Sequence, residues 1–178
     1  DASVSINNII NCINKNKLQL DKVFITHTHF DHIRYLGDIT YNFPSIKIYG
    51  FCIPEQDLGN NFVKVSNHQI IQIGTEMITA IHTPGHYPDS MCYWHRLENY
   101  LFTGDTIFVG RTGRTVGSKS NIKDLYNSVY NKILKLPCDT IIFPGHNYGH
   151  KLNITLKENI NYSSFFQCTT EQEFVKVM

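Results

Sequence analysis

The stretch "THTHFDH", residues 26–32, constrains this chain more than any other part of its sequence. It holds three histidines and one aspartate, and it directly follows an apolar run that predicts a short buried strand. Imidazole and carboxylate groups are the ligands that zinc-type ions take in proteins. Because alternate residues of an extended segment point to the same side, His27 and His29 can bind one ion. Asp31 and His32 follow at a turn and can face a second ion.

Side chains with the same chemistry follow three further predicted strands. His86 follows "ITAIHTPG", Asp105 follows "YLFTG" and His146 follows "TIIFPG". Ligands and catalytic groups concentrate in loops that a rigid sheet positions. Two ions in one site need a bridging carboxylate, for which Asp105 is the candidate. The seven residues leave open positions for water on both ions, which is typical of catalytic rather than structural metal sites.

The remaining pattern predicts an α/β domain with a sheet core. Strands are expected in "DKVFIT", "SIKIYG", "NHQIIQIGTEMITAIHTPG" with a turn at "GTE", "DSMCYWHRLENYLFTGD" with a turn near Glu98-Asn99, and "DTIIFPG". Helices are expected in "SVSINNIINCINKNK", in residues 121–136 with Pro137 as the stop, and around 155–161 and 170–177. Because no repeat or linker composition interrupts the chain, residues 1–178 are interpreted as one domain.

Composition narrows the class of function. Hydrophobic residues make up 42% and charged residues 17% of the chain, as in folded globular proteins. A formal net charge of +1 argues against a nucleic-acid partner. No apolar run reaches the roughly 18 residues of a membrane-spanning helix, so no membrane partner is expected. The five cysteines are widely spaced and odd in number, which predicts reduced thiols and a cytoplasmic location.

The motifs "THTHFDH", "HTPGH", "LFTGD" and "FPGH" resemble, in sequence and in order, the metal motifs of the metallo-β-lactamase superfamily. The resemblance implies an αββα sandwich of two sheets with outer helices, and it implies that the first strands of that fold are missing before Asp1. Carried over by position, it implies a first metal on His27, His29, His86 and Asp105, and a second on Asp31, His32, Asp105 and His146. His82, which opens "HTPGH", is expected in a supporting role.

Within the superfamily, "LFTGDTIFVGRTGRT" resembles the corresponding run of glyoxalase II and of the persulfide dioxygenases. The glyoxalase II resemblance implies a hydrolase with two zinc ions that acts on a glutathione thioester such as S-D-lactoylglutathione by attack of metal-bound hydroxide. Asp31 is the predicted catalytic residue, which orients the hydroxide. Arg114, which can pair bidentately with a carboxylate, and Tyr148 in "GHNYG" are predicted to bind the thiol carrier.

Two alternatives stay open at this point. A persulfide dioxygenase, acting on glutathione persulfide, would bind one iron through His27, His86 and Asp105 rather than two zinc ions or a mixed zinc and iron pair. Two histidines and one carboxylate with open positions suit non-haem iron. The other alternative is a metal-binding scaffold without catalysis, against which the seven intact ligand positions argue.

Overall fold

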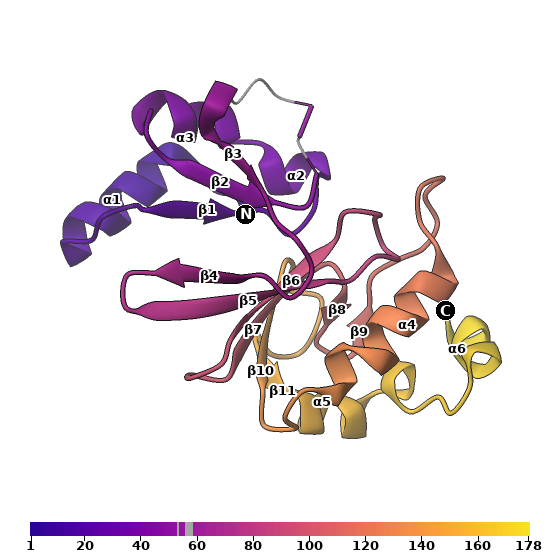
Figure 1. The fold of residues 1–178 in the computed structure, drawn as a ribbon. Coiled ribbons are helices and arrows are strands. Elements are labelled where there is room, and N and C mark those ends of the chain that lie inside the picture. Colours follow the sequence, from indigo (N-terminus) through magenta and orange to yellow (C-terminus); the bar gives the residue numbers. More distant parts are fainter. Residues whose placement is uncertain (53, 56–58) are drawn as a thin grey trace. The chain divides into compact units, whose positions relative to one another are not determined.

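The computed structural model describes residues 1–52, 54–55 and 59–178. Contacts within the chain divide it into two compact units, Asp1–Val65 and Ser66–Met178 (Figure 1). Each unit has its own sheet and its own hydrophobic core. The interpretation of the whole chain as one domain stays a prediction.

A parallel sheet forms the centre of the first unit. Its strands β1 (Lys22–Phe24), β2 (Lys47–Gly50) and β3 (Phe62–Lys64) are neighbours in that order. Parallel strands need a crossover, which the short helices α2 (Phe30–Ile33) and α3 (Leu36–Asn42) supply between β1 and β2. The core holds Val23, Ile25 and Ile48 from the sheet region and Leu36 and Ile39 from α3.

Helix α1 (Ile6–Asn16) opens the first unit and packs Ile6 and Ile9 against this core. Its apolar residues recur at helical spacing on one face, which is why the sequence predicted the helix. The predicted strands in "DKVFIT" and "SIKIYG" are also confirmed. Strand β3 has only three residues and was not predicted.

The second unit contains a six-stranded sheet in the order β11-β10-β7-β6-β5-β4. Its strands are β4 (Ile70–Ile73), β5 (Glu76–His82), β6 (Met91–His95), β7 (Tyr100–Gly104), β10 (Ile141–Pro144) and β11 (Ile154–Thr155). Strands β4 to β7 form an antiparallel meander, and β10 lies parallel to β7. Both predicted turns are confirmed, and each has a residue with positive φ, Gly74 at 57° and Asn99 at 55°.

Three helices and a small hairpin complete the second unit. The hairpin consists of β8 (Ile107–Phe108) and β9 (Arg111–Thr112). The helices are α4 (Ile122–Asn131), α5 (Leu156–Tyr162) and α6 (Glu171–Val177), with short 3-10 turns at Gly59–Asn61 in the first unit and at Ile133–Lys135 and Ser164–Phe166 in the second. The predicted tail helices are therefore confirmed. No helix among the described residues has the length and apolar character to cross a lipid bilayer.

Helix α4 links β7 to its parallel neighbour β10 and is shorter than predicted. Asn121 caps its start by accepting hydrogen bonds from two backbone N–H groups, and Leu125 and Val129 enter the core. The prediction of one helix to residue 136 was wrong, because Lys132 leaves helical backbone angles (φ −123°, ψ −64°) and a 3-10 turn follows. That turn buries Ile133, and Lys132 Nζ donates to the His82 carbonyl at 2.6 Å. These tertiary contacts outweigh the helical pattern of the sequence.

Candidate metal-binding site

Three predicted ligands lie at one edge of the six-stranded sheet. Strands β5 and β7 are both antiparallel to β6, and β10 is parallel to β7, so all three strands end at the same edge. His86, Asp105 and His146 follow these three strands in turn. The backbone N–H of Gly145 donates to the Gly104 carbonyl at 2.8 Å, which joins the ends of β10 and β7. The topology therefore explains why residues 60 positions apart in sequence gather here.

The carboxylate of Asp105 lies within reach of both histidines of its unit. Asp105 Oδ2 is 3.7 Å from His86 Nε2 and 3.6 Å from His146 Nε2. Ligand atoms lie about 2.0–2.2 Å from a zinc ion, so two donors on one ion are at most about 4.4 Å apart. The side chains of Asp105 and His86 are only 11% and 10% exposed. One carboxylate oxygen is thus placed where it can share an ion with either imidazole.

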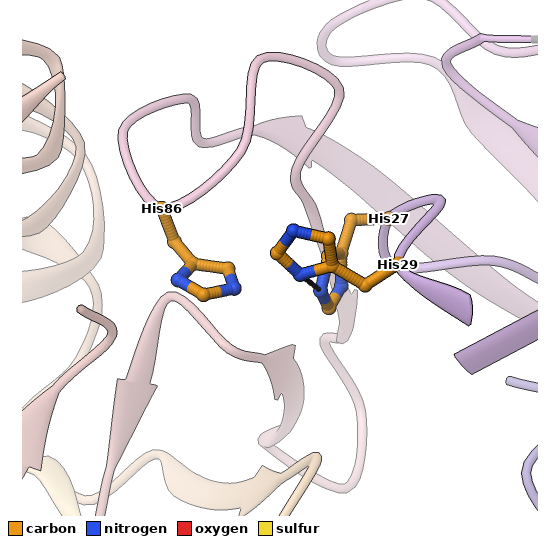
Figure 2. A group of neighbouring side chains, drawn as sticks. All are labelled: His27, His29 and His86. Carbon is orange, nitrogen blue, oxygen red and sulfur yellow. Dashed lines mark hydrogen bonds between the residues drawn. The ribbon is translucent and has the colours of Figure 1, made fainter. Parts of the chain in front are cut away.

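The first unit carries its donors on the segment between β1 and α2. His27 Nε2 and His29 Nδ1 are 2.9 Å apart, as the dashed line in Figure 2 marks. His32 Nε2 is 3.7 Å from Asp31 Oδ2, and the Asp31 side chain is 58% exposed. Both separations also fall below about 4.4 Å, the largest distance between two donors on one zinc ion. Each of these pairs therefore fits a single ion.

A further residue, Asp1, contacts the predicted ligand His32. Asp1 Oδ2 lies 2.8 Å from His32 Nδ1, and it also accepts from the Thr26 hydroxyl at 2.8 Å. Its Oδ1 accepts from the Thr26 backbone N–H at 2.6 Å. Sequence reasoning did not find this role. The one signal was the resemblance to the family, which implies opening strands that end at an aspartate in the position of Asp1.

The two predicted substrate-binding residues both belong to the second unit. Tyr148 is 56% exposed, stacks on His146 at 5.3 Å between ring centroids, and meets Phe108 edge-on at 5.0 Å. The side chain of Arg114 is exposed just beyond β9. Figure 2 shows the His86 imidazole extending from the loop after β5, and His86 Nδ1 lies 2.8 Å from the Arg114 carbonyl. Their role in binding substrate stays a prediction.

Histidines outside the ligand set have structural contacts. His82 Nε2 lies 2.8 Å from the Pro88 carbonyl, and its backbone N–H donates to the Asn67 side chain. Burial lowers the pKa of His82. His95 Nε2 lies 3.3 Å from a Glu76 carboxylate oxygen, at the ends of β6 and β5 opposite the ligand-bearing edge. The His82 ring thus bridges the loop from residue 82 to residue 88, and its supporting role for the metal ligands stays a prediction.

Comparison with known families identifies the class of this chain. Residues 11–146 match the family model described as the metallo-beta-lactamase superfamily. The chain therefore belongs to the metallo-β-lactamase superfamily, and the predicted fold is confirmed. This match spans all seven predicted ligand positions.

Particular relatives refine this picture. The chain is 36% identical over 136 residues to a hydroxyacylglutathione hydrolase of Francisella tularensis subsp. novicida, covering 76% of this chain and 53% of that protein. It thus spans about half the length of this curated relative. The probable polyketide biosynthesis zinc-dependent hydrolase BaeB of Bacillus velezensis is 27% identical and matches over 98% of this chain and 78% of its own. The crystal structure of ETHE1 from Myxococcus xanthus superposes with a TM-score of 0.85 at 26% identity, over 97% of this chain and 74% of that one.

Proposed function

We propose that the chain is the metal-binding catalytic part of a hydrolase that cleaves a thioester, and that this substrate is a glutathione thioester such as S-D-lactoylglutathione. The observation that carries the proposal is the position of Asp105 Oδ2, within 3.7 Å of the Nε2 atoms of both His86 and His146. A carboxylate between two imidazoles is what a pair of ions needs as a bridge. The similarity to a hydroxyacylglutathione hydrolase supports the choice of substrate class.

The proposed ligands are the seven residues of the family motifs. By the family motifs, His27, His29, His86 and Asp105 would hold one zinc ion, and Asp31, His32, Asp105 and His146 would hold the other. The donor chemistry supports this assignment, because nitrogen and carboxylate oxygen are zinc ligands. The four donor pairs described above, two in each unit, are each close enough for one ion. When bound, such ions lower the pKa of coordinated water to about 7 and polarise a carbonyl oxygen.

The chain's own residues would then orient water and substrate. The exposed carboxylate of Asp31 lies beside His32 and can accept a hydrogen bond from the attacking water, which fixes the direction of attack. The Arg114 guanidinium can pair with a carboxylate of the thiol carrier in a bidentate manner. The Tyr148 hydroxyl, held by stacking on His146, can donate to the same carrier.

The alternative is a persulfide dioxygenase with one iron on His27, His86 and Asp105. Two histidines and one carboxylate suit non-haem iron, and the likeness to ETHE1 supports this alternative in part. Both readings use His86 and Asp105, so the ligand geometry of the second unit does not separate them. The identity of the bound metal and the reaction catalysed would separate the two alternatives.

The test combines elemental analysis with two assays on the 178-residue chain, which is expressed in a medium that contains no single metal in excess. About two zinc ions per chain and hydrolysis of S-D-lactoylglutathione support the hydrolase. About one iron per chain and oxygen uptake with glutathione persulfide support the dioxygenase, and absence of bound metal supports the scaffold. Asp105→Ala should lose metal and activity together. Asp139→Ala, which removes an exposed aspartate outside the motifs, should retain both.

A further inference from the structure

The hairpin of β8 and β9 returns the chain to two of the predicted ligands. Gly113, directly after β9, donates its backbone N–H to the Thr106 carbonyl at 3.1 Å. A Cβ atom at position 113 would lie 1.9 Å from the Asp105 carbonyl oxygen and 3.0 Å from His86 Cβ. The contact with the Asp105 carbonyl is impossible without a shift of the backbone, and the contact with His86 Cβ would push that side chain by a few tenths of an ångström. Only glycine therefore allows the hairpin to lie this close to Asp105 and His86.

The residue after Gly113 fixes the protonation of the His86 ring. His86 Nδ1 is 2.8 Å from the Arg114 carbonyl oxygen. Because a carbonyl oxygen can only accept, Nδ1 must carry the proton. In a neutral imidazole protonated at Nδ1, Nε2 has the lone pair that a metal ligand needs. Nε2 is also the atom that lies 3.7 Å from Asp105 Oδ2.

Helix α5 forms hydrogen bonds with the turn of the hairpin. The amide of Asn159, which is 1% exposed, donates to the Phe108 carbonyl at 2.9 Å and accepts from the Gly110 backbone N–H at 2.7 Å. Ser163, at the end of the helix, donates its hydroxyl to the Gly110 carbonyl at 2.7 Å. These bonds hold Phe108 and Gly110 at the turn of the hairpin, and the hydrogen bond from Gly113 to Thr106 holds the chain next to Arg114.

We propose that Gly113 and the Arg114 main-chain carbonyl hold His86 in its Nδ1–H tautomer before any metal binds. The inference rests on the proposed function, because it takes His86 to be a metal ligand through Nε2. A histidine ligand usually donates its second ring N–H to a fixed acceptor, and loss of such a partner weakens metal binding about 10–100-fold. Gly113 is thus a positioning residue that acts through His86.

The first measurement needs no variant of Gly113. Long-range proton–nitrogen NMR spectra of the metal-free 178-residue chain report which ring nitrogen of each histidine is protonated. The His86 signals are assigned by their loss in His86→Gln. We expect Nδ1 protonated and Nε2 bare at a pH where the ring is neutral. Protonation of Nε2 in the metal-free chain would overturn the proposal.

The second measurement compares two glycines that follow β9. Gly113→Ala should lower zinc affinity about 10–100-fold, measured by competition with a chelator, and should remove the Nδ1–H signature of His86. Gly117→Ala is the matched control, because a Cβ at Gly117 would meet no atom within 4 Å. Gly113→Ala with zinc affinity within about twofold of the unmodified chain contradicts the proposal. If Gly113→Ala does not fold, the tautomer of the unmodified chain decides.

These readouts also separate the proposal from the proposed function. A chain with the Nδ1–H tautomer and the expected loss of affinity in Gly113→Ala, but without thioester hydrolysis, would retain the positioning role and lose the hydrolase assignment. A chain that hydrolyses the thioester with His86 protonated at Nε2 when metal-free would retain the assignment and lose the positioning role.

Discussion

The Asp1 carboxylate accepts a hydrogen bond from His32, with 2.8 Å between Asp1 Oδ2 and His32 Nδ1. Because Nδ1 donates to this carboxylate, the lone pair of the neutral ring lies on Nε2, which faces Asp31 at 3.7 Å. The same logic applies to His86 and the Arg114 carbonyl in the second unit. Two predicted ligands in different units thus have the same tautomer fixed by different acceptors.

Replacement of Asp1 tests this relationship. Asp1→Ala removes the acceptor for His32 and for both donors of Thr26, so zinc affinity should fall about 10–100-fold. The buried Thr26 donors that lose their partner should lower the free energy of unfolding by about 1–3 kcal/mol. Chelator competition and urea denaturation measure the two effects. Asp38→Ala, an exposed aspartate of the same unit, should change neither; equal zinc affinity in both variants would refute the role of Asp1.

A hydroxyl bridge joins the loops that carry His86 and Asp105. Thr83 Oγ1 and Thr106 Oγ1 are 2.8 Å apart, and both side chains are buried. Thr83→Val or Thr106→Val alone should destabilise the chain by about 1–3 kcal/mol, because each leaves a buried hydroxyl without that partner. The double variant should cost less than the sum of the singles, with a coupling of about 0.5–3 kcal/mol.

The control for this cycle keeps the hydroxyl and removes only a methyl group. Thr83→Ser and Thr106→Ser both retain the hydroxyl bridge, so the two serine substitutions should show little coupling with each other. Urea denaturation of all six variants supplies the free energies. Strict additivity of the two valine variants would show that the bridge contributes nothing.

Most of the site could be predicted because its residues follow strong local patterns. His27, His86, Asp105 and His146 each come after an apolar run that forms a strand, so strand ends pointed to the ligands. The short strands β3, β8, β9 and β11 have only two or three residues, too few for a periodic pattern to emerge.

Contacts between distant residues could not be predicted in the same way. Asp1 and His32 are 31 positions apart, and Asn159 and Phe108 are 51 apart, so no local spacing relates them. The end of α4 was missed for a similar reason. Lys132 leaves the helix to reach the His82 carbonyl, a contact that depends on how the helix packs against the sheet.

Cys92 should make stability depend on pH at the alkaline end. Burial raises the pKa of this thiol from 9.0 to about 11. Between these values the unfolded chain loses the thiol proton while the folded chain keeps it. The contribution of the protonated Cys92 thiol to the free energy of unfolding is therefore full below pH 9 and declines as the pH rises to about 11. The total loss is on the order of 2–3 kcal/mol.

The measurement compares urea denaturation of the unmodified chain and of Cys92→Ala from pH 8 to pH 11. Other alkaline groups titrate in both proteins, so the difference between the two curves isolates the thiol. The unmodified chain should lose more stability across this range than the variant. Parallel curves would mean that the folded thiol titrates as it does in the unfolded chain.

Arg114 should have two separate effects. Its side chain should bind the substrate, and its main-chain carbonyl should orient His86. Arg114→Gln removes the guanidinium but retains the carbonyl that accepts from His86 Nδ1, so zinc affinity should stay unchanged. KM for S-D-lactoylglutathione should rise about tenfold with kcat little changed, because a charge-assisted contact to the carrier's carboxylate is lost in ground and transition states alike. Arg111→Gln removes a second exposed arginine, three residues earlier in β9, and should leave KM unchanged. An equal rise in KM in both variants would indicate general electrostatic attraction of an anionic substrate rather than a specific contact with Arg114.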